Sequence, residues 1–127
     1  MLKLSLLTVI CIANSGSAFA VQGPSWSPDL ATVQKLDAEI AKSPNFDGFS
    51  CPSPDVAEFS RYYWGASDSA GHRVLAGQFL RVKDFPGEKA GVHLQRGPGI
   101  ADGGCSVANL YYDVEGSKPA KVSWGGR

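Results

Sequence analysis

Two cysteines remain in this chain once a predicted export signal is removed, and they constrain its fold more than any other feature. The first residues, Met1-Leu2-Lys3, give a positive start, residues 4–12 are almost wholly apolar, and Ala18-Phe19-Ala20 offers the small residues that a signal peptidase reads. The apolar run is shorter than the roughly 20 residues that a membrane-spanning helix needs. We therefore interpret residues 1–20 as a cleaved signal peptide rather than as a membrane anchor.

Cleavage after Ala20 removes Cys11 and leaves Cys51 and Cys105, an even pair in a chain bound for an oxidising compartment. A bridge between them would close a loop of about 55 residues and stabilise the fold by about 4 kcal/mol on the chain-entropy estimate. The sequence thus predicts a periplasmic or secreted protein whose residues 21–127 form a single small domain held by a Cys51–Cys105 disulfide.

The charges exclude two classes of partner. The chain carries 12 Lys and Arg against 12 Asp and Glu, with no block of one sign. Such a surface does not attract nucleic acid, and no basic amphipathic helix is present for anionic lipid. The expected partner is a protein or an envelope glycan, while the oligomeric state stays open.

One amphipathic helix is predicted near the start of the domain. Ser27-Pro28-Asp29 is typical of a helix start, and Ser43-Pro44 of a helix end. Between them, apolar residues recur at spacings of three and four, at Leu30, Val33, Leu36 and Ile40.

From residue 58 onward the period changes to two, which indicates strands joined by short turns. The predicted strands are residues 59–64, 72–83 (with a bend or bulge at Gly77), 92–96, 105–113 and 121–124. Short connections favour antiparallel pairing. We expect an α+β fold in which one N-terminal amphipathic helix packs on a curved antiparallel sheet of about four to five strands.

Little in the chain points to catalysis, a metal or a cofactor. His72 and His93 have no further ligands at metal-binding spacing, there is no Gly-x-Ser-x-Gly motif, and the paired cysteines are not nucleophiles. The enzymatic alternative is an envelope hydrolase that uses His93 and Asp102 as an acid–base pair, which requires both within reach of one substrate atom.

Aromatic side chains are the better binding candidates. One helix covers one face of a sheet, so some rings should lie on the open face, where tyrosine and tryptophan suit a sugar or a protein hot spot. The glycine-rich loop of residues 97–104 is a second candidate, because glycines let a backbone approach a ligand. The predicted binding residues are Tyr62, Trp64, Tyr112, Trp124 and, in the loop, Asp102.

The segment Arg73-Val74-Leu75-Ala76-Gly77 is similar to the Gln-Val-Val-Ala-Gly hairpin with which cystatins enter the cleft of a cysteine protease. Arg73 stands where that family has glutamine. The resemblance implies a cystatin-like order of elements, and an NTF2-like arrangement also fits one helix on a curled sheet.

The sequence as a whole favours a small exported binding or inhibitory module without catalytic machinery. Besides the hydrolase, the remaining alternative is a structural component of an envelope assembly.

Overall fold

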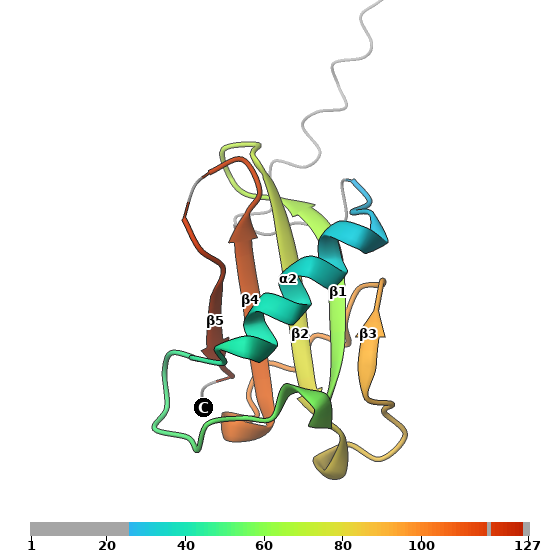
Figure 1. Cartoon of the computed structure of the whole chain (residues 1–127), viewed down its shortest axis with the longest axis vertical. Coiled ribbons are helices and arrows are strands. Elements are labelled where there is room, and N and C mark those ends of the chain that lie inside the picture. Colours follow the sequence, from blue (N-terminus) through green and yellow to red (C-terminus); the bar gives the residue numbers. More distant parts are fainter. Residues whose placement is uncertain (1–25, 117, 126–127) are drawn as a thin grey trace, which may run out of the picture.

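The computed structural model describes residues 26–116 and 118–125, in which one α-helix packs on a five-stranded sheet (Figure 1). The predicted signal peptide and Cys11 lie outside the described residues. The α-helix is α2 (Leu30–Lys42); the strands are β1 (Phe59–Ser67), β2 (Arg73–Arg81), β3 (Gly91–His93), β4 (Val107–Asp113) and β5 (Lys121–Trp124); short 3₁₀ turns are η2 (Val56–Glu58), η3 (Val82–Asp84) and η4 (Gly104–Ser106).

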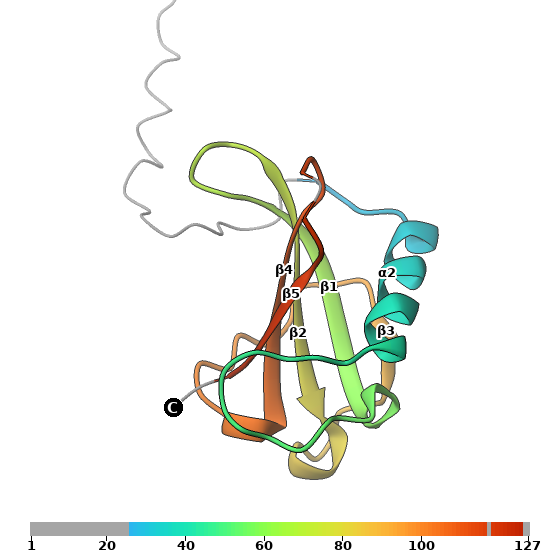
Figure 2. The same cartoon turned by 60° about the vertical axis from the view of Figure 1, so that its left-hand side comes forward.

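Helix α2 confirms three of the four predicted apolar positions, whereas Leu30, in its first turn, is 48% exposed. Val33, Leu36 and Ile40 are buried, and the helix ends at Lys42, directly before the predicted stop. Its N-cap is Asp29 rather than a residue further upstream. The expected α+β class is therefore correct, with the helix lying across one face of the sheet (Figure 2).

The sheet is mixed, so the expectation of a wholly antiparallel sheet is wrong. The strand order is β3-β1-β2-β4-β5, and β3 runs parallel to β1 while every other neighbouring pair is antiparallel. The physical reason is the connection of residues 82–90, which is longer than a hairpin turn and carries the chain past β1 to its far side. A strand that arrives there in the direction of β1 pairs in parallel.

The boundaries of four strands differ from the predicted ones. Strand β1 continues to Ser67, three residues beyond its predicted end, and β4 begins at Val107, after η4. The second strand ends at Arg81, where η3 begins, and β3 ends at His93 rather than at residue 96. The predicted bend at Gly77 is absent, because this residue pairs with Tyr63 on one side and Leu110 on the other in an unbroken register. A Cβ on Gly77 would lie 3.0 Å from the Cβ of Leu110, so the glycine permits close packing instead.

Alternate residues of each strand face the helix and form the core. Phe59 and Tyr63 of β1 are fully buried on this face. Trp124 lies in the same core, 6% exposed, with its ring 5.0 Å from that of Phe46. The expectation that Trp124 contributes to an open face is therefore incorrect, because the last strand turns this ring toward the helix side.

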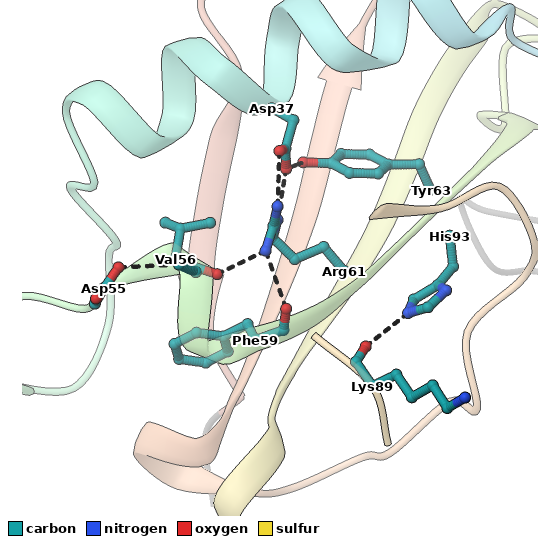
Figure 3. A network of polar contacts seen from close by, with 9 residues as sticks. Asp37, Asp55, Val56, Phe59, Arg61, Tyr63, Lys89 and His93 are labelled. Atoms are coloured by element: carbon teal, nitrogen blue, oxygen red, sulfur yellow. Dashed lines mark hydrogen bonds and ion pairs between the residues drawn. The ribbon is translucent and has the colours of Figure 1, made fainter. Parts of the chain in front are cut away.

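A partly buried ion pair fastens the helix to β1 (Figure 3). The guanidinium of Arg61 donates to both carboxylate oxygens of Asp37 on α2, at 2.7 and 3.0 Å, and the hydroxyl of Tyr63 donates to the same carboxylate at 2.6 Å. Arg61 Nη1 also donates to the carbonyls of Val56 and Phe59. Both charges are thus held in a network of several hydrogen bonds, which offsets the cost of taking them partly out of water.

The predicted disulfide is present. Cys51 and Cys105 are bonded, with their Cα atoms 5.8 Å apart. The bridge ties the irregular segment after α2 to η4, directly before β4.

Candidate functional site

The face of the sheet away from the helix is covered around Gln78 and is open only in part, contrary to the expectation of an open face. The loop of residues 94–103, orange in Figure 1, passes behind the strands from β3 to β4. It is held there by Gln78 of β2, whose Oε1 accepts from the backbone N–H groups of Gly99 and Ile100 and whose Nε2 donates to Ile100 O and to Asn109 Oδ1. Gln78 is only 4% exposed, so this glycine-rich segment is a strap across the outer face.

Two of the predicted aromatic residues lie on this outer face. Tyr62 donates from its hydroxyl to Glu88 Oε1 at 2.6 Å, a bond that raises the pKa of the tyrosine, and its ring lies 5.0 Å from that of His93. The ring of Trp64 lies under the guanidinium of Arg96, 5.7 Å from its centroid. The indole Nε1 of Trp64 is buried and has no hydrogen-bond partner. Both rings are half-buried beside the strap.

The other predicted residues lie elsewhere. Tyr112 is on the helix side, where it lines a hollow with Leu36 and Ile40. Asp102 is exposed on the strap, close to the end of β5, because its carbonyl oxygen would lie 3.0 Å from a Cβ on Gly125. The structure therefore does not bring the five predicted side chains into one site.

A groove lies next to Trp64, where β1 loses its neighbour. Strand β3 pairs only with Ser60–Tyr62, so within the described residues no strand pairs with residues 63–67 of β1 on this side. The cavity here measures about 340 Å³. We call it the edge groove, and its lining residues are Trp26, Ser27, Pro28, Tyr63, Trp64, Gly65, Leu94, Gln95 and Arg96.

The two walls of the edge groove come from segments distant in sequence. On one side Trp26 is fixed by its indole N–H, which donates to the carbonyl of Ala66 at 2.9 Å, and its backbone carbonyl packs on Gly65 so closely that no Cβ would fit there. On the other side Leu94 leaves 44% of its surface exposed. Sequence reasoning did not predict Trp26, Leu94 or Arg96 as site residues. The only local signal for them was that Leu94 is an apolar residue next to His93.

The pair proposed for the enzymatic alternative does not converge. His93 lies on β3, at one edge of the sheet, and its Nε2 is 2.8 Å from the carbonyl of Lys89 (Figure 3). Asp102 lies near the end of β5, at the opposite edge. Among the described residues, no group of three or more His, Cys, Asp or Glu side chains is arranged to hold a metal ion.

No described helix has both the length and the apolar character required to cross a membrane. Comparison with known proteins gives no relative, because no family model, no curated protein and no solved structure matches the chain.

Proposed function

We propose that the protein is a small exported binding module that takes an extended segment of another polypeptide into the edge groove. The observation that carries the proposal is that, within the described residues, no strand pairs with residues 63–65 of β1 beyond β3. Further along β1, the carbonyl of Ala66 already accepts from the indole of Trp26. An unpaired strand edge is a template for backbone hydrogen bonding, and many recognition domains bind peptides by adding a strand there.

The shape of the edge groove favours a peptide as the ligand over a flat protein surface. An incoming strand would continue the line of β3 and lie between the Trp26 wall and the Leu94 wall. Alternate side chains of such a strand point to opposite sides, so one set would contact the exposed Leu94 and the other Trp26. The backbone supplies affinity in this mode, and the walls supply selectivity.

Export is part of the same proposal. The Cys51–Cys105 disulfide is consistent with an oxidising compartment, periplasmic or extracellular, where the partner would be found. We do not extend the proposal to a cystatin-like wedge. The five residues that resemble the cystatin hairpin lie inside β2, where Arg73–Gly77 pair with β1 and the stretch from Val74 to Ala76 is buried.

The test begins with selection of binding peptides from a library of random linear peptides displayed on phage, with residues 21–127 as the target. An enriched peptide is then titrated into isotope-labelled protein. We expect the amides of residues 63–65 to shift, and those that are not bonded to β2 to gain protection from hydrogen exchange. Leu94→Asp should weaken binding by about tenfold or more, since it replaces a buried apolar contact with a charge.

The matched control is Leu30→Asp, because Leu30 is equally exposed, at 48%, but lies on α2 and does not line the groove. This variant should bind as the unmodified protein does. Peptides that shift residues away from β1, or that bind both variants equally, would show that the groove is not a peptide site. If a soluble oligosaccharide, and not a peptide, binds at this part of β1, the ligand of the groove is a glycan and the peptide proposal is wrong.

A further inference from the structure

A second hollow, at the opposite edge of the sheet, has a chemistry different from that of the edge groove. It lies where the chain leaves α2 and runs beside β5, and it measures about 700 Å³. Asp47 lines this hollow, and its backbone is fixed against β5 by two hydrogen bonds. Asp47 N–H donates to Val122 O and Asp47 O accepts from Trp124 N–H, both at 2.8 Å. We call this hollow the β5 cleft; its polar and aromatic lining consists of Ser43, Asn45, Asp47, Tyr111, Asp113, Lys118 and Lys121.

Most of these side chains have unused hydrogen-bonding capacity. Within residues 26–116 and 118–125, the side chains of Asn45, Asp47, Lys118 and Lys121 make no hydrogen bond or ion pair. Together they offer both donors and acceptors, since carboxylates only accept, ammonium groups only donate and the amide does both. A ligand that satisfies them must itself carry groups that donate and accept, as hydroxyls do.

The charges of the β5 cleft balance. Among the residues that line it, Asp47 and Asp113 oppose Lys118 and Lys121, so the lining itself carries no net charge. Asp68, whose charge also acts on Tyr111, lies outside the lining, and its carboxylate accepts from the backbone N–H groups of Ala70 and His72. This balance disfavours phosphate, nucleotide and strongly acidic or basic peptides, and it favours a neutral polar ligand.

Tyr111 adds an aromatic platform. It is 38% exposed, among the most exposed large apolar side chains of the described residues. Partial burial of the phenol, and then the nearby carboxylates of Asp68 and Asp113, raise its pKa. An exposed tyrosine ring with polar groups around it presents an apolar face and a wet rim, which suits a sugar ring.

We infer that the β5 cleft binds a neutral saccharide, with one sugar ring against Tyr111 and its hydroxyls hydrogen-bonded to Asn45, Asp47 and the two lysines. The volume of the cleft lies within the range of about 300–1,000 Å³ that is usual for small-molecule sites. This inference is independent of the peptide site, because the two hollows share no lining residue.

The experiment is a titration of isotope-labelled protein, residues 21–127, with three neutral probes: maltotriose, cellotriose and the β1,4-linked trimer of N-acetylglucosamine. At least one should shift the amides of residues 45–47 and 118–121 at millimolar concentration. Tyr111→Ala should weaken that binding by about tenfold, whereas Tyr111→Phe should retain it, because stacking needs the ring and not the hydroxyl.

Asp47→Ala is the second variant, since the backbone of Asp47 pairs with β5 while its side chain has no partner among the described residues. It should weaken binding although the spectrum of the free protein stays unchanged outside the cleft. Lys83→Gln, at an exposed lysine that does not line the cleft, is the control. The inference is overturned if none of the three probes shifts the cleft residues, if Tyr111→Ala and Asp47→Ala both bind as before, or if an acidic trisaccharide binds more tightly than every neutral one.

Discussion

At the scale of single residues, the contact of Tyr63 with Asp37 links the stability of the fold to pH. The hydroxyl of Tyr63 is buried and donates to a carboxylate that already carries the guanidinium of Arg61. Burial first, and then the hydrogen bond and the negative charge of Asp37, raise the pKa of Tyr63 far above its ordinary value of 10.0. The phenol is therefore protonated in the folded protein throughout the range in which it ionises in the unfolded chain.

The sign of the pH effect follows from linkage. Above about pH 10 the unfolded chain loses the Tyr63 proton and the folded protein keeps it, so the free energy of unfolding falls as the pH rises. The slope that this one group contributes is about 1.4 kcal/mol per pH unit. Tyr63→Phe should lower the free energy of unfolding by about 1 kcal/mol at neutral pH, because the hydrogen bond to Asp37 is lost. The same substitution should remove the contribution of residue 63 to the fall of this free energy above about pH 10.

The two stability curves should therefore converge between about pH 10 and about pH 11. Urea unfolding of both proteins across that range measures the effect. Because Tyr62 and Tyr111 remain in both, their raised pKa values do not affect the comparison. Parallel curves for the two proteins would mean that Tyr63 does not titrate on unfolding.

At the scale of elements, the sequence predicts what local periodicity determines. Helix α2 and strand β5 follow the predicted residues closely, because caps, breakers and apolar spacing act over a few positions. The place of β3 depends instead on a contact between residues about 30 positions apart, which no local pattern encodes. Gln78 shows the same limit: a polar residue in an alternating strand predicts exposure, yet the strap buries it with all its hydrogen bonds satisfied.

The same limit applies to the candidate sites. Trp64 was predicted as one of the aromatic residues of a strand with one uncovered face, and it does line the edge groove. Trp26 and Leu94 join it only through the tertiary fold. Tyr111, next to the predicted Tyr112, faces the other side of β4, where the β5 cleft lies. An alternation of residues indicates which side chains share a face, and it does not indicate which loops cover that face.

The disulfide is the element-scale feature with the largest expected effect on stability. Its cysteines are 54 positions apart, so oxidation constrains a long loop of the unfolded chain. We expect the double variant Cys51→Ser and Cys105→Ser to lose about 2–4 kcal/mol of unfolding free energy, measured in urea at neutral pH. Reductant should lower the midpoint of the unmodified protein and leave that of the double variant unchanged. Equal urea midpoints for the double variant and the unmodified protein, both measured without reductant, would contradict this expectation.

At the scale of the whole molecule, the two proposed sites lie at opposite edges of one sheet. The edge groove is beside β1 and β3, the β5 cleft is beside β4 and β5, and β2 separates them. Three strand spacings between β1 and β5 amount to roughly 14 Å, and each hollow opens at its own edge. A polypeptide and a saccharide would then occupy the molecule together, which would make it an adaptor between an exported protein and a glycan.

Independent sites predict an absence of thermodynamic coupling. Ligands couple only if each favours one of two conformations of the protein, and a sheet whose central strands are fully paired and whose helix is fastened by Asp37 and Arg61 offers no second packing. We expect the dissociation constant of the selected peptide to change by less than about twofold when the saccharide is saturating. Calorimetric titration of peptide into free and saccharide-loaded protein gives the comparison. A tenfold loss of peptide affinity would show that the two ligands compete or that the strap, which runs from β3 past Gln78 to β4, transmits a change between the edges.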